Sequence, residues 1–303
     1  MIYMSIEDLR SGLVINDKKA LIISGPTGIG KSKFAISLAK KNNGIIINAD
    51  SMQVYNDIKI ISAQPDINDL KSVQHYLYGI KSATENFSVG EWIRCLEKLL
   101  RSNELKNKIP IIVGGTGLYI NAAINGISIM PKIEKNILDK SNLLFEKIGI
   151  INFRNLVEKI DPSYVKKNID RQRLIRSYSV FKQTGLSLSD WHKKTKKYKI
   201  NKNFDLVLLK QERNIIYEKC DMRFDAFIKN GAIEEIKLLK EKGLNRSLPI
   251  FKCLGVGWIL KYLDNEIKLE EAIKLSKRDT RRYVKRQLTW FRHNFKPNKV
   301  LVI

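Results

Sequence analysis

One short motif constrains the fold of this chain more than any other feature. Residues 25–32 read Gly-Pro-Thr-Gly-Ile-Gly-Lys-Ser, which satisfies G-x-x-x-x-G-K-[ST], and an apolar run at residues 20–24 precedes them. The glycines let backbone N–H groups surround an anion, the helix N-terminus that follows adds positive potential, and the lysine adds a point charge. We call residues 25–32 the glycine loop. The residues predicted to bind phosphate are Gly25, Pro26, Thr27, Gly28, Ile29, Gly30, Lys31 and Ser32.

Apolar runs along the chain predict the sheet to which this loop belongs. Four runs are almost entirely apolar, as strands buried on both faces of a parallel sheet are: residues 20–24, 45–48, 111–113 and 206–209. Helical patterns separate them and dominate residues 214–295. Between 127 and 203 no convincing strand occurs, but helix boundaries do, at Asp170 and Gly185. We therefore predict a P-loop NTPase-like α/β core, residues 1–126 and 204–303, with an inserted all-helical domain, 127–203.

The glycine loop does not identify its phosphate compound. It would hold ATP in a kinase, and it would equally hold the diphosphate of another substrate. A motor ATPase needs a second strand that ends in a carboxylate for the metal ion. The run at 111–113 ends instead in Gly114-Gly-Thr-Gly117, here called the GGTG loop, which has no carboxylate. The sequence thus argues against a motor ATPase, and the hydroxyl of Ser32 is the predicted Mg²⁺ ligand.

A single carboxylate follows the second predicted strand. Asp50 stands two residues beyond the run at 45–48. In open α/β sheets ligands bind at the carboxyl ends of the strands, the edge that also carries the glycine loop. We therefore expect Asp50 to lie near the bound phosphates. It could bind a metal ion, act as a general base or cap the N-terminus of a following helix.

The charge of the chain favours a polyanionic partner, although biased nucleotide composition would also give a lysine-rich protein. Its 55 Lys and Arg against 31 Asp and Glu leave a net charge of +24. Residues 277–299 hold nine basic residues and one acid, and four of the nine form a stripe at helical spacing: Arg278, Arg281, Arg282 and Lys285. We expect Arg281 and Lys285 to contact RNA phosphates. The interleaved aromatic residues either stack on bases or fill the core.

Composition also limits the compartment. No apolar run approaches the ~20 residues of a membrane span, and the acidic Glu7 and Asp8 do not suit a signal peptide. Cys95, Cys220 and Cys253 form no C-x-x-C pair, which argues against a disulfide framework or a zinc finger. We expect a cytoplasmic monomer without a membrane partner.

Five motifs in a fixed order resemble one enzyme family. They are the glycine loop, Asn-Ala-Asp-Ser-Met-Gln-Val-Tyr at 48–55, Ile-Val-Gly-Gly-Thr-Gly-Leu-Tyr at 112–119, Asp-Arg-Gln-Arg-Leu-Ile-Arg at 170–176, and Thr-Arg-Arg-Tyr-Val-Lys-Arg-Gln-Leu-Thr-Trp-Phe at 280–291. Over residues 21–295 the chain resembles the tRNA dimethylallyltransferases, also called tRNA isopentenyltransferases. The resemblance implies transfer of the dimethylallyl group from dimethylallyl diphosphate to N6 of adenosine 37, beside the anticodon. Mg²⁺ is the implied cofactor, and diphosphate leaves.

The resemblance also implies roles for residues. Asp50 is the base on N6, Thr116 contacts the reacting centre, and residues Thr27 to Ser32 bind the prenyl diphosphate. The residues implied to touch tRNA are Asp50, Ser51, Met52, Gln53, Thr116, Gln172, Arg173, Leu174, Ile175 and Arg176. These roles suit the chemistry, because the N6 lone pair is delocalised and needs a base, and the leaving diphosphate needs cations. Adenine in a stacked loop must also be flipped out.

Arg213 and Arg223 lie where the family carries arginines after its last core strand. One of them is expected to clamp the diphosphate, unless both are surface charges of a helix. The chain departs from the family pattern at Lys219-Cys220 and at three further positions: Gln64, Tyr76 and Trp258. We expect these departures to affect rate and tRNA selectivity rather than reaction type.

Three other functions explain part of the sequence. A P-loop kinase explains the glycine loop and the sheet but not the basic stripe. A prenyltransferase of free adenine nucleotides would need less basic surface. A non-catalytic RNA-binding protein regulated by nucleotide leaves Asp50 and Thr116 without a role. We therefore expect a prenyltransferase that modifies tRNA adenosine.

Overall fold

The computed structural model describes residues 2–4, 19–165 and 170–303, so Glu7 and Asp8 lie outside the described residues. The chain divides into two compact units. Residues 1–125 and 200–303 form the core unit, and residues 126–199 form the insert. The insert thus begins one residue before the predicted start and ends four residues before the predicted end.

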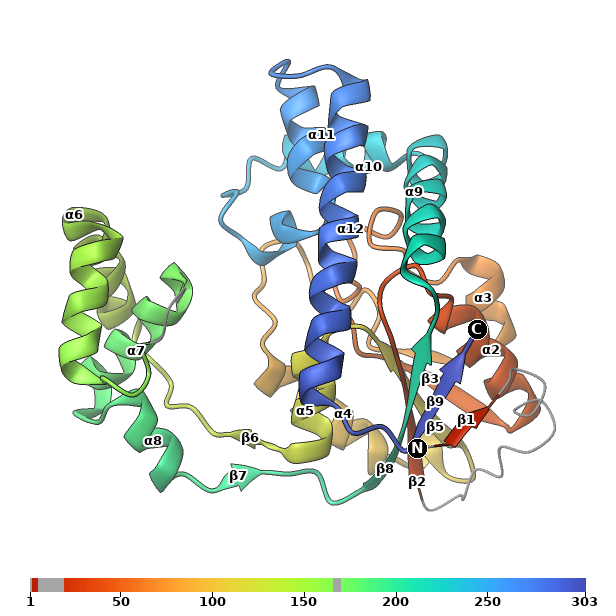
Figure 1. The fold of residues 1–303 in the computed structure, drawn as a ribbon, viewed down its shortest axis with the longest axis horizontal. Helices are drawn as coiled ribbons and strands as arrows, with labels where there is room; N and C mark the ends of the chain where they lie inside the picture. The colour runs from red at the N-terminus through yellow and green to blue at the C-terminus, as the bar shows by residue number, and fades with distance from the viewer. Residues whose placement is uncertain (1, 5–18, 166–169) are drawn as a thin grey trace. The chain divides into compact units, whose positions relative to one another are not determined.

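The core unit contains a parallel sheet. Among the described residues seven strands form it, in the order β1-β9-β8-β2-β5-β3-β4, and every neighbouring pair is parallel (Figure 1). The strands are β1 (Ile2–Met4), β2 (Lys19–Ser24), β3 (Gly44–Asn48), β4 (His75–Tyr76), β5 (Ile109–Gly114), β8 (Asn203–Lys210) and β9 (Lys299–Val302). The four predicted strands are confirmed as β2, β3, β5 and β8. The three others, of two to four residues, are too short to give a clear apolar run.

The strand order predicts a binding crevice at one edge of the sheet. Strand β3 follows β2 in the chain, but β5 lies between them in the sheet. The register pairs Ser24 with Gly114 and Asn48 with Val113, so all three strands end at the same edge. The chain continues from β2 to β3 in one direction across the sheet and from β5 to β8 in the other. Ligands bind where the connections of two neighbouring parallel strands diverge in this way.

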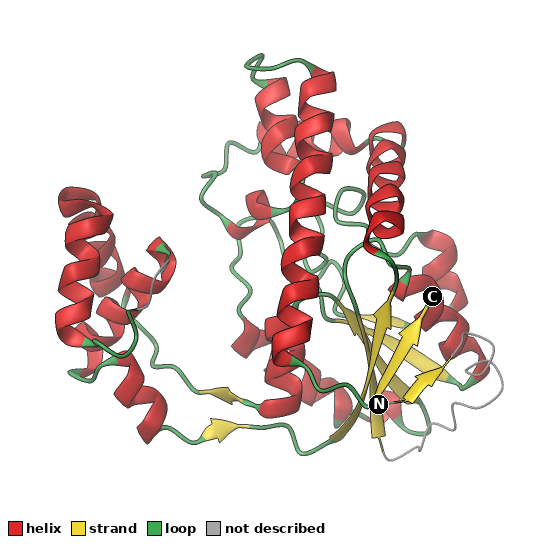
Figure 2. Ribbon diagram, viewed as in Figure 1, coloured by secondary structure: helices red, strands yellow, loops and turns green. Residues whose placement is uncertain are grey.

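Helices cover the sheet and extend beyond it. In the core unit they are α2 (Lys31–Lys41), α3 (Ile67–Ser72), α4 (Val89–Leu100), α5 (Gly117–Asn125), α9 (Arg213–Lys229), α10 (Ala232–Glu241), α11 (Val256–Leu263) and α12 (Leu269–Asn294), with short 3₁₀ turns η1 (Asn103–Leu105) and η2 (Pro249–Lys252). The predicted helical character of residues 214–295 is confirmed. Helix α12 packs against α9 and α11 (Figure 2). Its buried positions recur every three or four residues, as one face of a helix does.

The insert is helical apart from one short pair of strands that the sequence does not reveal. Strands β6 (Ile127–Ser128) and β7 (Lys197–Tyr198) pair antiparallel, and the helices are α6 (Lys135–Ile160), α7 (Arg171–Thr184) and α8 (Leu188–Lys194). As predicted, Asp170 caps α7 by accepting a hydrogen bond from the N–H of Arg173, and Gly185 ends it with a φ of 71°. No helix among the described residues has the length and apolar character of a membrane span.

Candidate active site

The glycine loop joins β2 to α2 at the crevice. Gly28 adopts a φ of 81°, and a Cβ there would lie 2.4 Å from Sγ of Cys220, so only glycine fits. Lys31 opens α2, and its Nζ donates hydrogen bonds to the carbonyl oxygens of Gly25 (3.0 Å) and Pro26 (2.9 Å). The ammonium group therefore lies against the loop, as the motif predicts.

Two cationic side chains contact this loop, Lys31 from within it and Arg223 from α9. Burial lowers the pKa of Lys31 to about 8, and the charge of Asp50 partly opposes that shift. Arg223 of α9 donates from Nη2 to Oγ1 of Thr27 at 2.5 Å. Burial lowers the pKa of Arg223 as well, and its buried Nε–H has no acceptor among the described residues. An anion bound here would supply that acceptor and favour both charges.

The second candidate arginine lies elsewhere. Arg213 is the first residue of α9 and is exposed, with its guanidinium 5.8 Å from the centroid of the Tyr217 ring. It does not line the cavity that contains Arg223. Of the two candidate arginines, Arg223 lines the cavity and Arg213 does not.

Asp50 is fixed by the buried end of β3. The side chain of Asn48 binds the backbone of Asp50 twice, accepting from its N–H (2.7 Å) and donating to its carbonyl (2.9 Å). Oδ1 of Asp50 accepts from the N–H of Met52 at 2.9 Å, while Oδ2 accepts no hydrogen bond from the described residues. No helix begins after Asp50, since residues 51–54 form turns, so the interpretation as a helix N-cap is wrong. One oxygen holds a turn and the other is available for chemistry.

Thr116 of the GGTG loop lies against this turn. Its Oγ1 accepts from the N–H of Ser51 at 3.1 Å, and its own N–H donates to the carbonyl of Ala49 at 3.4 Å. The approach requires glycine two residues earlier, because a Cβ on Gly114 would lie 2.1 Å from the oxygen of Ala49. The sequence-predicted partners Asp50 and Thr116 are thus brought together by backbone contacts.

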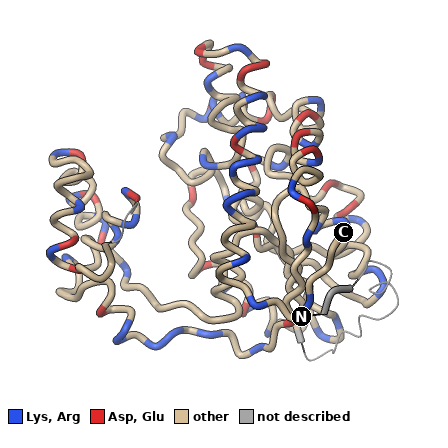
Figure 3. The backbone as a smooth tube through the Cα atoms, viewed as in Figure 1, with Lys and Arg blue, Asp and Glu red and all other residues tan. Residues whose placement is uncertain are grey.

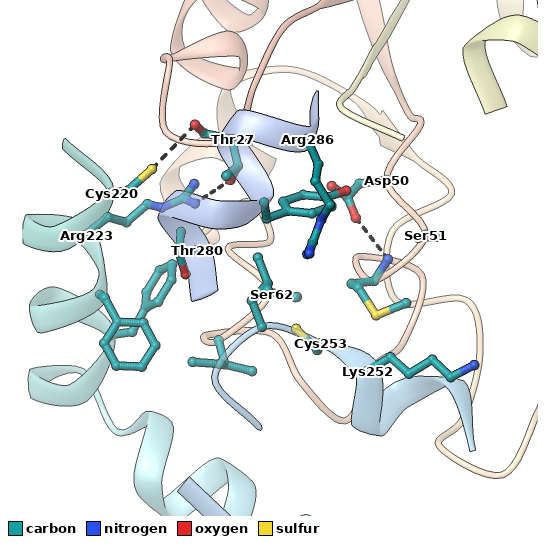
Figure 4. Close-up of a pocket in the computed structure, with 16 residues that line it drawn as sticks. Thr27, Asp50, Ser51, Ser62, Cys220, Arg223, Lys252, Cys253, Thr280 and Arg286 are labelled. Atoms are coloured by element: carbon teal, nitrogen blue, oxygen red, sulfur yellow. Dashed lines mark hydrogen bonds between the residues drawn. The ribbon is translucent and has the colours of Figure 1, made fainter. Parts of the chain in front are cut away.

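A cavity of about 280 Å³ unites the two halves (Figure 4). Five sequence-predicted residues line it: Thr27, Asp50, Ser51, Met52 and Arg223. In Figure 4, Arg223 reaches toward Thr27, and Asp50 and Arg286 are drawn apart from that pair. Part of the wall is apolar, formed by residues such as Ile61, Phe224 and Leu254. The cavity can accept an anionic group at one end and an apolar group along this wall.

Sequence reasoning missed the contribution of α12. Thr280, Tyr283 and Arg286 line the same cavity, and Tyr283 and Arg286 also line a neighbouring cavity of about 260 Å³ that contains Thr116 and Trp290. The signal was present in the motif at 280–291. Thr280, Tyr283 and Arg286 are each three residues apart, and residues at this spacing lie on one face of a helix. The same motif therefore supplies both the basic stripe and a wall of the cavity.

Three of the residues predicted to contact RNA are buried or hydrogen-bonded within the protein. Leu174 and Ile175 are 0% and 5% exposed in the apolar core of the insert, so their side chains do not face solvent. Their neighbours on α7 are exposed at Gln172 and Arg173 and half-buried at Arg176. Nε2 of Gln53 donates to the carbonyls of residues 62 and 63, and Gln53 does not line the cavity.

The basic stripe of α12 is largely paired with acids. Figure 3 shows where the basic and acidic residues stand along the backbone. Arg281 contacts Asp221 of α9 at 2.5 Å, and Arg278 and Arg282 both contact Asp279. Lys285 is exposed and forms no ion pair with a described residue. The stripe is therefore less of a free positive surface than its spacing predicts.

Three departures from the family pattern have places in the structure. Gln64 donates from Nε2 to the carbonyl of Tyr55 at 2.7 Å, so it holds the loop beside the cavity. Trp258 donates from Nε1 to Asp279 at 2.8 Å. Tyr76 stands in the edge strand β4. None of the three lines the cavity.

A magnesium ion would have few protein ligands here. Ser32 is exposed at the second position of α2. Among residues 2–4, 19–165 and 170–303, no group of three or more His, Cys, Asp or Glu could hold a metal ion. In loops of this kind the Ser or Thr hydroxyl binds Mg²⁺ together with substrate phosphates, and Ser32 stands at that position of the glycine loop.

Known proteins share this sequence and fold. A family model described as IPP transferase matches residues 53–294. The tRNA dimethylallyltransferases of Ehrlichia canis (strain Jake) and Pelagibacter ubique (strain HTCC1062) are 43% and 40% identical, over 92% and 90% of this chain and 92% and 88% of theirs.

Solved structures agree. The full-length tRNA isopentenylpyrophosphate transferase from Bacillus halodurans has a TM-score of 0.67 at 32% identity, covering 94% of this chain and 89% of that chain. A eukaryotic dimethylallyltransferase acting on tRNA has a TM-score of 0.76 at 28% identity, covering 93% and 74%. This chain therefore belongs to the IPP transferase family, the tRNA dimethylallyltransferases.

Proposed function

We propose that this enzyme transfers the dimethylallyl group of dimethylallyl diphosphate to N6 of adenosine 37 in tRNA. One observation carries the proposal. Thr27, Arg223 and Asp50 line one cavity, and Figure 4 draws Asp50 apart from the Thr27–Arg223 pair. An anion-binding group and a carboxylate base are what prenyl transfer to an amine requires of one site.

Asp50 is proposed as the general base. The lone pair of N6 forms a bond to C1 of the allylic group, the C1–O bond breaks, and its electron pair leaves with the diphosphate. The N6 proton passes to a carboxylate oxygen of Asp50. Because Oδ1 already accepts from the N–H of Met52, Oδ2 is the oxygen that receives it. Thr116 holds the turn from the other side.

The glycine loop is proposed to stabilise the leaving diphosphate. Negative charge grows on the diphosphate as the C–O bond breaks, and fixed cations at that position lower the barrier. Lys31 would release the carbonyls of Gly25 and Pro26 and turn to the anion, and Nε of Arg223 would donate the hydrogen bond that it lacks. Mg²⁺ held by Ser32 and the phosphates would neutralise further charge when bound.

The base to be modified must leave its stack to reach a cavity inside the core unit. The net charge of +24 favours an RNA partner. Exposed basic residues on both units are candidates for its phosphates, Lys285 on α12 and Arg173 on α7 among them. A free nucleotide would not need them.

The test is a transfer assay with purified protein, labelled dimethylallyl diphosphate and Mg²⁺. The acceptors are an anticodon stem-loop with A37, the same stem-loop with G37, and AMP. We expect label in the A37 stem-loop alone. Label in AMP would instead indicate a prenyltransferase of free nucleotides. Absence of label from every acceptor would overturn the proposed function.

A further inference from the structure

Gln287 of α12 is buried between the two glycine-rich loops, with 6% of its surface exposed. Its carboxamide uses both ends. Oε1 accepts from the N–H of Thr27 in the glycine loop at 2.9 Å, and Nε2 donates to the carbonyl of Gly115 in the GGTG loop at 2.9 Å. One side chain, 172 residues along the chain from Gly115 and 260 from Thr27, therefore joins the loops that follow β2 and β5.

The carboxamide of Gln287 is tightly packed against Gly115. A Cβ on Gly115 would lie 2.6 Å from Nε2 of Gln287 and 3.3 Å from the carbonyl oxygen of Gly25. Any side chain at position 115 would therefore displace the carboxamide of Gln287. A shift of Gln287 breaks its hydrogen bond to at least one loop unless that loop moves with it.

Each loop carries one half of the site. Thr27 accepts the hydrogen bond of Arg223, which belongs to the diphosphate side. Thr116, next to Gly115, accepts from the N–H of Ser51 and so contacts the Asp50 turn. The carboxamide of Gln287 is thus a side-chain link between the two loops, in addition to the pairing of Ser24 with Gly114 in the sheet.

We propose that Gln287 is a positioning residue that sets the distance between the leaving diphosphate and the base at Asp50. The inference rests on the proposed function, and Gln287 itself touches no reacting atom. A carboxamide suits the task because it presents one acceptor and one donor in fixed geometry. A displacement of about 1 Å between reacting groups costs on the order of 10²-fold in rate.

The test compares Gln287→Glu and Gln287→Leu with Thr289→Ala, an exposed position on the same helix. A glutamate carboxylate cannot donate to the carbonyl of Gly115, but a protonated glutamic acid can. We expect single-turnover transfer to fall about 10²-fold in both Gln287 variants. The dissociation constant for the stem-loop should stay within about twofold of wild type in both, and that for dimethylallyl diphosphate within about twofold in Gln287→Leu. The Gln287→Glu carboxylate lies near Lys31, so rates of this variant are measured at saturating dimethylallyl diphosphate. The rate of Gln287→Glu relative to wild type at each pH should recover as pH falls, whereas Gln287→Leu should show no recovery.

Several outcomes would overturn the inference. Unchanged transfer rates in both variants would do so, as would losses explained wholly by weaker substrate binding or by unfolding. A ratio of the Gln287→Glu rate to the wild-type rate that does not change with pH would also overturn it. If Gln287→Leu does not fold, Gln287→Asn retains both groups with a shorter reach and takes its place. If wild type, Thr289→Ala and the Gln287 variants all transfer at the same rate, the proposed function stands and only the positioning role fails. A wild-type protein that transfers nothing removes the proposed function and this role with it.

Discussion

The two sides of the cavity are built in different ways. On the side proposed to hold the diphosphate, the glycine loop passes from β2 directly into α2 and offers backbone N–H groups and Lys31, and α9 adds Arg223. On the acceptor side, β3 runs into turns that hold one carboxylate, and the side chain of Asn48 binds the backbone of Asp50 on both sides. Both segments leave the same edge of the sheet, yet one spreads its function over many groups and the other concentrates it in one.

This difference predicts how each side responds to substitution. An anion bound by many donors loses only part of its stabilisation when one donor is removed. A proton acceptor has no partial substitute. The acceptor side should therefore be the more sensitive to a single change, and it should lose chemistry rather than binding.

The largest effect is expected for Asp50→Asn. The amide oxygen can still accept from the N–H of Met52, so the turn should persist, but no proton acceptor remains. Single-turnover prenylation of an A37 stem-loop should fall about 10²–10⁴-fold, with both substrates bound nearly as in wild type. The matched control is Asp66→Asn, which changes the exposed N-cap of α3.

Two outcomes would change this assignment. A rate of Asp50→Asn close to that of wild type would remove Asp50 as the base. Recovery of most of the rate in a series of rising Mg²⁺ concentrations would instead make Asp50 chiefly a metal partner.

On the diphosphate side, Arg223→Ala should cost about 10²-fold in transfer rate, the low end for loss of one donor at a developing anion. Affinity for inorganic diphosphate, measured by competition, should fall as well. Arg213→Ala is the matched control on the same helix and should stay within about twofold of wild type, because surface changes are usually mild. Equal losses in the two variants would mean that the cavity does not distinguish these arginines.

A smaller effect, the pH dependence of diphosphate affinity, distinguishes Lys31 from Arg223. Lys31 in the free enzyme is protonated below its pKa of about 8 and neutral above it. Affinity for inorganic diphosphate should therefore weaken as pH rises above 8, by at most about tenfold per pH unit. Lys31→Arg keeps its charge throughout this range and should abolish the dependence. Parallel profiles for wild type and Lys31→Arg between pH 7 and 9.5 would contradict the assignment.

The sequence predicts one side of this comparison better than the other. The glycine loop and the central strands could be predicted because their pattern is local, and the proximity of Asp50 followed from the edge of a parallel sheet. The choice of Arg223 over Arg213 could not, since it depends on how α9 is rotated against the sheet. The role of Gln287 was equally hidden, because its partners are distant in the chain.

Helix α12 shows the same limit for charge. A count over residues 277–299 finds one acid, but Asp221 and Asp225 of α9 lie 60 and 52 residues before the bases that they contact, Arg281 and Lys277. Tertiary packing therefore neutralises bases that appear free in the sequence. A basic face can be identified from spacing, but the residues left for RNA cannot.

The smallest effect tests that conclusion. Lys285→Ala should flatten the dependence of log Kd for tRNA on log salt by about one unit, the value for one lost phosphate contact. Arg281→Ala should change that slope less, because its guanidinium already contacts Asp221. The measurement is a salt titration of stem-loop binding for wild type, both variants and Arg281→Ala with Asp221→Asn. Equal flattening by Lys285→Ala and Arg281→Ala would mean that the ion pair opens to RNA, and the two bases would then be equivalent after all.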